Sequence, residues 1–208
     1  TQPEYDSALI IHGIRHRRYF RLEGSIQKLD DKMQELLDTV ITQERVDGLV
    51  DSYKPVLEKT MPLYPDIDLL DMSPAELIPY IDGMYDGILD NYEAFRRALE
   101  YPAPMFVSMP EVRSDGTIRF AWDASYSYQG RPVTYNVRVY EDPRMQDLVF
   151  EQTGIEQTEY ISGQSLPEGT YYLKVTAVDS QGNEQFSLEH VDGDNLFVFG
   201  LLEFEIGR

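Results

Sequence analysis

The chain has 208 residues, of which 42% are apolar, so it can bury the core of one large domain or two ordinary ones. Its 37 acidic and 18 basic residues give a net charge of −19, which argues against nucleic acids and anionic membrane surfaces as partners. The absence of cysteine excludes disulfides and thiol nucleophiles. No apolar run approaches the length of a membrane span, and no signal peptide pattern is present, so we expect no transmembrane segment.

The first residues are basic, unlike the rest of the chain. Arg15, Arg17, Arg18 and Arg21 cluster there, and we expect them to pair with acidic residues of the helices or with a part of the protein that precedes Thr1. His12 and His16 have the i, i+4 spacing of helical metal ligands, but no third ligand follows them. We therefore predict no metal site.

The first half of the chain has helical periodicity. A first helix is predicted from Arg17 to Val40, and a second from the cap residue Thr42 to Lys59, with a kink caused by Pro55. The linker 61–72 carries three aspartates but lacks the glycine and the distal glutamate of a calcium loop, so solvated carboxylates are the favoured interpretation.

A third helix is predicted from Ser73 to Glu100. Ser73 and Glu76 form a capping box, with proline at the first helical position. One face carries three aspartates at i, i+4 and i+8, which either face solvent or meet a cationic partner, a metal or the N-terminal arginines. These aspartates are Asp82, Asp86 and Asp90.

A Pro-Ala-Pro sequence ends the helix. The predicted domains are 1–102 and 104–208.

After residue 104 the periodicity changes to two, which is typical of half-buried strands. The strongest signal alternates Tyr171, Leu173, Val175 and Ala177 with outward residues, and stops at the turn formers that begin with Asp179. Short strands with turn signals between them predict an antiparallel sandwich. The other predicted strands are Thr117–Trp122, Val133–Tyr140, Leu148–Phe150, Thr158–Ile161 and Leu196–Ile206, with Gly200 as a bulge.

The second half carries Trp122, the run Tyr135–Val139, and the sequence Leu166–Tyr171 that leads into the central strand. In these residues it resembles a fibronectin type III domain. The resemblance implies a tyrosine corner, in which a buried tyrosine hydroxyl binds upstream backbone. The Leu-to-Tyr interval is one residue shorter than is usual in the family, so either Tyr171 or Tyr172 takes this role.

Three sequence features extend over both halves: the helix Arg15–Leu37, the helix end Asn91–Arg97, and the sandwich sequences that begin at Trp122, Gly169 and Asp179. In these features the chain resembles the C-terminal part of a spore coat protein H (CotH) type protein. The resemblance implies an atypical protein kinase that uses ATP and a divalent metal, located in the spore coat or cell envelope of a Gram-positive bacterium.

The family's nucleotide and metal motifs would precede Thr1. This chain has no glycine-rich phosphate loop, no strand lysine in its first half and no catalytic-loop Asp…Asn pair, so we assign it no catalytic residue and no cofactor.

The chain is therefore predicted to be a two-domain protein, a bundle of three main helices followed by a fibronectin type III-like sandwich. The favoured hypothesis is a non-catalytic segment whose helices support a kinase core and whose sandwich binds a protein or an envelope component. The alternative is a free-standing adhesion or carbohydrate-binding module. A hydrolase is disfavoured, because neither the N-terminal histidines nor His190 lie near a nucleophile elbow.

The candidate binding loops lie at one end of the predicted sandwich. A Tyr/Ser/Gly-rich loop supplies tyrosines that give contact area at low entropic cost, unless they pack over the end of the sandwich. The turn after the central strand is expected at the same end. The candidate residues are Tyr126, Tyr128, Asp179, Gln181 and Asn183.

Overall fold

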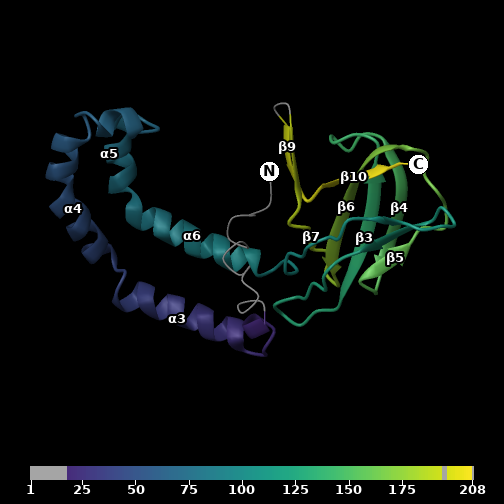
Figure 1. The fold of residues 1–208 in the computed structure, drawn as a ribbon. Helices are drawn as coiled ribbons and strands as arrows, with labels where there is room; N and C mark the ends of the chain where they lie inside the picture. Colours follow the sequence, from purple (N-terminus) through teal and green to yellow (C-terminus); the bar gives the residue numbers. More distant parts are fainter. Residues whose placement is uncertain (1–17, 194–195, 208) are drawn as a thin grey trace. The chain divides into compact units, whose positions relative to one another are not determined.

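The computed structural model describes residues 18–193 and 196–207 (Figure 1). Residue contacts divide the chain into two compact units, Thr1–Arg97 and Ala98–Arg208. The first unit is helical in its described residues, and the second is built from antiparallel strands.

The first two long helices are α3 (Ser25–Thr39) and α4 (Gln43–Thr60). Helix α3 begins later than predicted, because Gly24 has a φ of 73° that interrupts the helical backbone. Thr42 caps α4 as predicted, since its hydroxyl accepts the N–H of Arg45 at 3.4 Å. Helix α4 continues through Pro55.

The prediction of a single third helix is wrong. After a short 3-10 helix η2 (Asp66–Leu69), the chain forms α5 (Pro74–Asp82) and then a separate α6 (Met84–Ala98). The break falls at Gly83, whose φ of −86° and ψ of 12° lie outside helical values. The start is as predicted, with the Glu76 carboxylate accepting from the N–H and the hydroxyl of Ser73 at 3.0 and 2.7 Å.

In the described part of the first unit, the helices contact each other in pairs and bury few apolar side chains. The Tyr92 hydroxyl of α6 donates to Asp30 of α3 at 2.8 Å, and Lys54 of α4 forms an ion pair with Asp82 of α5 at 2.7 Å. Lys54 is thus a cationic partner for the first of the three aligned aspartates. The large apolar side chains that this unit buries are Val46, Val50, Met61, Tyr92 and Phe95.

The second unit is a two-sheet sandwich in its described residues (Figure 1). In the first sheet β2 (Ile118–Ala121) lies between β1 (Glu111–Val112) and β5 (Glu159–Ile161). The second sheet has the order β10 (Leu202–Ile206), β6 (Gly169–Asp179), β3 (Val133–Tyr140), β4 (Leu148–Ile155). Adjacent strands in both sheets are antiparallel, which confirms the predicted β-sandwich.

The alternation in β6 decides which side chains enter the core. Its odd-numbered residues from Tyr171 to Ala177 are at most 3% exposed, and they meet the inward residues of the facing sheet. Phe120 stacks on Phe150 of the opposite sheet, with ring centroids 5.8 Å apart. The core comprises Met105, Val107, Ile118, Phe120, Trp122, Tyr135, Val137, Val139, Ile155, Tyr171, Leu173, Val175, Ala177, Phe204 and Ile206.

The tyrosine corner is formed by Tyr171. Its ring is buried beside Phe204, and its hydroxyl donates to the carbonyl of Pro167 at 3.0 Å. Tyr172 points to the other side of β6, so it cannot take this role. The shorter Leu-to-Tyr interval therefore leaves the corner bond intact.

The prediction of one long final strand over 196–206 is wrong. A short strand β7 (Glu184–Phe186) pairs with the end of β6, and the chain then leaves the sheet as a hairpin before it returns as β10. The hairpin strands are β8 (His190–Gly193) and β9 (Leu196–Phe199), and β9 stands out from the sheet in Figure 1. An interrupted edge strand, rather than a bulge, explains the length of the apolar run.

Gly200 sits where the hairpin rejoins the sheet. It has a φ of +72°, and a Cβ at this position would lie 2.6 Å from the Cβ of Phe186. Its N–H donates to the carbonyl of Glu189 at 2.7 Å, which closes the base of the hairpin. Glycine is required here for both conformation and space.

We expect Gly200→Ala to reduce the free energy of unfolding by about 2 to 4 kcal/mol, because it combines left-handed backbone strain with overpacking. Gly154→Ala is the matched control, since Gly154 has a φ of +70° but no atom within 4 Å of the added methyl. The control should lose about 1 kcal/mol in urea denaturation. Equal losses in the two variants would contradict a steric role for Phe186.

Candidate functional site

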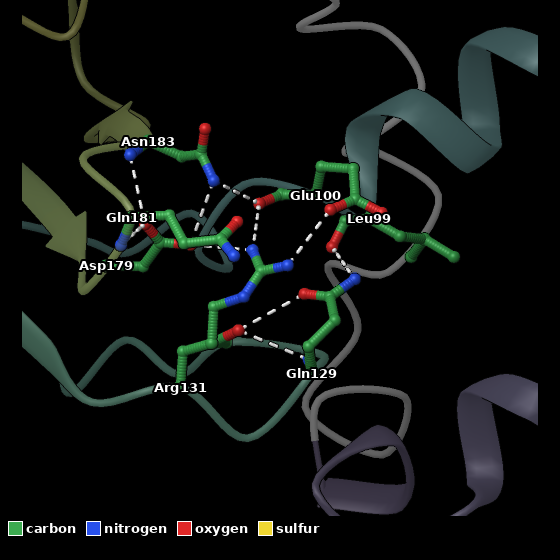
Figure 2. A network of polar contacts seen from close by, with 8 residues as sticks. Leu99, Glu100, Gln129, Arg131, Asp179, Gln181 and Asn183 are labelled. Atoms are coloured by element: carbon green, nitrogen blue, oxygen red, sulfur yellow. Dashed lines mark hydrogen bonds and ion pairs between the residues drawn. The ribbon is translucent and has the colours of Figure 1, made fainter.

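The predicted turn after the central strand is organised by a buried carboxylate. Asp179 ends β6 and is 5% exposed. It accepts the backbone N–H groups of Gln181 and Asn183, both at 2.9 Å, and the side-chain amide of Asn183 at 3.0 Å. Arg131 donates to the same carboxylate at 2.9 Å (Figure 2).

These contacts set the protonation state of Asp179. Burial by itself raises the pKa of this carboxyl, but the hydrogen bonds from Asn183, Arg131 and Gln181 outweigh burial and lower the pKa from 3.8 to about 2. Asp179 is therefore ionised at neutral pH, with its oxygens occupied by protein donors. It acts here as a structural anchor for the turn.

The same network holds the segment that begins the second unit. The Arg131 guanidinium donates to the carbonyl of Glu100 at 3.3 Å and pairs with its carboxylate at 3.2 Å. The Asn183 amide donates to the same carbonyl at 3.1 Å, and Gln129 donates to the carbonyl of Leu99 at 2.6 Å. Figure 2 shows Glu100 beside the Arg131 guanidinium and the Leu99 carbonyl beside the Gln129 side chain.

The tyrosines of the first loop are both half-buried. Tyr126 and Tyr128 contact each other edge to face with centroids 5.3 Å apart, and the carbonyl of Tyr126 accepts the N–H of Ala103 at 2.8 Å. The structure thus brings Asp179 and Asn183 together with Leu99 and Glu100. Gln181 contributes its backbone N–H, and its side chain is exposed.

Ligand binding by these loops stays a prediction. Sequence reasoning missed Arg131, Glu100 and Gln129, which complete the network. One signal for Arg131 was available: an aspartate that ends a buried strand needs a donor, and the loop before the neighbouring strand carries an arginine.

A second candidate site lies at the other end of β6 and was not predicted. It is a cleft of about 480 Å³ between the β3–β4 turn and the β8–β9 hairpin, a size within the usual range for ligand sites. Its lining comes from elements far apart in sequence. The lining residues are Asp142, Pro143, Arg144, Gln146, Asp147, Tyr172, Val191, Asp192, Gly193 and Glu203.

The charges in this cleft are mostly negative. Asp142 accepts three backbone N–H groups of its own turn, chiefly that of Asp147, and these bonds lower its pKa. The pKa of Tyr172 is raised by burial, and further by the charge of Glu203 and a hydrogen bond to it. Arg144 is the one basic residue among the lining residues described for the cleft.

The described residues carry neither a metal-binding cluster nor a membrane-spanning helix. No group of three or more histidine or acidic side chains there has the arrangement of a metal site. The aspartates of the 61–72 linker lie on or beside η2 and are exposed. His12 and His16 lie outside the described residues. No described helix combines the length and apolar character needed to cross a membrane.

Searches against known proteins found similarity only at the level of solved structures. No family model matches the chain, and no curated protein matches it. An Fn3-like protein from Clostridium thermocellum is 24% identical with a TM-score of 0.31, over 41% of this chain and 81% of its own.

Two structures of a protein described as FN3tt also match. One is 18% identical with a TM-score of 0.30, over 51% of this chain and 94% of its own. A mutant form is 17% identical with a TM-score of 0.28, over 41% and 88%. The strand order and the tyrosine corner of the second unit independently describe a fibronectin type III-like sandwich.

The depressed pKa of Asp179 predicts acid sensitivity. Because the carboxyl has a lower pKa folded than unfolded, its stabilisation is present above about pH 4 and is lost as pH falls towards 2. The loss should be about 2 kcal/mol in urea unfolding measured from pH 5 to pH 2.

Asp179→Asn should be less stable than the natural protein at pH 7 and should lose less stability over the same acid range. The matched control is Asp115→Asn, an exposed aspartate whose pKa is lowered by Thr117. An Asp179→Asn variant with an unchanged acid profile would show that another group causes the loss.

Proposed function

We propose that this chain is a non-catalytic interaction segment of a CotH-type atypical protein kinase. In this proposal the helical unit packs against the kinase core, and the fibronectin type III-like sandwich is an appended module that binds a protein or envelope component. The observation that carries the proposal is the exposed apolar surface of the helical unit.

That surface is clearest on α4. Leu49, Tyr53 and Val56 follow i, i+4, i+7 spacing on one helix face and are 60%, 63% and 56% exposed. The adjacent face, with Val46 and Val50, is buried within the unit. Other large exposed apolar residues of the unit are Tyr19, Leu22, Leu36, Val40, Leu63, Tyr64, Ile67, Leu69, Met72, Tyr80 and Met84.

Exposed apolar residues at helical spacing support protein binding. Single exposed apolar side chains are ordinary, but contiguous patches on soluble proteins mark interaction surfaces. On α4 the apolar stripe is wider than the face that the unit itself covers. A second protein surface over Leu49, Tyr53 and Val56 would give that stripe the burial that an amphipathic helix needs.

The kinase core is the partner favoured by the resemblance of the helical sequences to the CotH family. A site for ATP is not expected in this chain, whose sequence lacks the motifs that bind phosphates and metal. The sandwich has a complete core of its own, which supports its role as a separate module.

We expect the triple variant Leu49→Gln/Tyr53→Gln/Val56→Gln to bind a separately expressed CotH-type kinase core at least about 100-fold more weakly, because it removes three apolar contacts. Calorimetric titration measures the affinity. Asp47→Asn/Asp51→Asn on the opposite face of α4 is the control and should bind as the natural chain does. An unchanged affinity in the triple variant would exclude this face as the docking surface.

The chain alone should transfer no phosphate. Incubation with Mg²⁺, radiolabelled ATP and a coat-protein substrate is expected to leave the substrate unlabelled. Labelling by the purified 208-residue chain would overturn the non-catalytic assignment.

The coding sequence that precedes the Thr1 codon tests the parentage, because a kinase should show a strand lysine and acidic metal-binding motifs there.

A further inference from the structure

The acidic cleft of the sandwich has one wall held rigid by its own backbone. In the β3–β4 turn, the Asp142 carboxylate accepts the N–H groups of Arg144, Gln146 and Asp147 at 2.7 to 2.8 Å. Met145 adopts a φ of 59°, rare for a residue with a side chain. Its sulfur accepts from Lys174 of β6 at 3.6 Å, which ties the turn to the sheet.

The opposite wall is the inserted hairpin. Val191, Asp192 and Gly193 of β8 line the cleft. The hairpin is held by its ladder and by the backbone bond from Gly200 to Glu189 at its base. It thus adds a wall beside the outer face of the sheet.

The floor is the outer face of β6 and β10. Tyr172 and Glu203 are directly paired across these strands. The Tyr172 ring is half-buried, and the Glu203 carboxylate is beside it. An aromatic ring next to a carboxylate is a suitable contact surface for an organic cation, which gains from both the ring face and the charge.

The cleft is unbalanced in charge. Asp142 is occupied by its own turn, but Asp147, Asp192 and Glu203 add three further carboxylates, against the single lining guanidinium of Arg144. Among the described residues, no hydrogen bond or ion pair occupies the carboxylates of Asp147 and Asp192. Anionic acceptors therefore exceed cationic donors in a preformed cavity.

We propose that this cleft binds the guanidinium or ammonium group of an arginine or lysine side chain, presented on an extended basic segment of a protein partner. The carboxylates of Asp147, Asp192 and Glu203 would accept from the cation, and the Tyr172 ring would contact its alkyl stem or its charged head. This inference concerns the sandwich alone and does not depend on the kinase parentage.

Three features favour a cationic peptide over a sugar. A neutral sugar needs donors as well as acceptors, whereas the charged groups here are mainly acceptors. The volume of about 480 Å³ exceeds one side chain, so flanking residues of a peptide also fit. The net charge of −19 would also speed the approach of a basic segment in a salt-dependent way.

The test titrates the full chain with a tetra-arginine peptide at low ionic strength and follows binding by calorimetry. Free arginine amide is the second probe, and a chito-oligosaccharide is the third. Asp192→Asn/Glu203→Gln should weaken peptide binding at least about tenfold. Glu156→Gln/Glu93→Gln removes the same charge at exposed positions outside the cleft and should change affinity less than about twofold.

A second variant separates folding from binding. Tyr172→Leu keeps an apolar side chain on the sheet and all carboxylates, and should weaken peptide binding about threefold or more through loss of the ring contact. Peptide binding tighter than that of arginine amide would support a protein partner. Equal weakening by the cleft and control pairs, absence of peptide binding, or binding of the oligosaccharide alone would each overturn the proposal.

Discussion

The sandwich depends on strand β6, which is hydrogen-bonded along both edges. It pairs with β3 on one side and with β7 and β10 on the other. Its inward residues, from Tyr171 to Ala177, are almost fully buried in the core. One strand therefore fixes the register of its sheet and contributes to the packing between the sheets, since a slip of one residue would turn every apolar side chain to the opposite face.

The two ends of β6 serve different purposes because different side chains emerge there. At its C-terminal end, Asp179 is buried and accepts hydrogen bonds from protein donors. Arg131 and Gln129 of the same network bind the backbone carbonyls of Glu100 and Leu99, so this end of β6 has a structural role. At its N-terminal end, the outward Tyr172 lines a cleft. A buried carboxylate must be satisfied from within, whereas carboxylates at an open cleft can accept from a ligand.

The sequence predicts those features that depend on local pattern. Period-two alternation located β3 with the bounds observed and assigned the buried face of β6. Threonine and serine capping signals placed the starts of α4 and α5. The errors have physical causes: apolar periodicity continues across Gly83 and across Gly200, so the pattern could not reveal that the backbone changes direction at these two glycines.

The sites were harder to predict, since they join residues that are distant along the chain. The sequence predicts Tyr126, Tyr128, Gln181 and Asn183 as binding residues from the composition of their loops and from the shared end of the sandwich. The structure does place Asn183 beside Glu100. The Asn183 amide, however, donates to the Glu100 carbonyl, which also accepts from Arg131, so Asn183 belongs to an internal network. The cleft needs Asp147 from one turn, Asp192 from an inserted hairpin and Glu203 from the returning strand. No spacing rule links these positions.

The two units differ in how they satisfy their apolar residues, and this difference bears on function. The sandwich closes its core with side chains from both sheets. In the helical unit, by contrast, α4 buries Val46 and Val50 but leaves Leu49, Tyr53 and Val56 exposed on the neighbouring face. A fold that completes its own core is free to bind ligands through charge and shape at its surface. In the proposed function, the exposed face of α4 is the surface over which a partner would supply the missing apolar contacts.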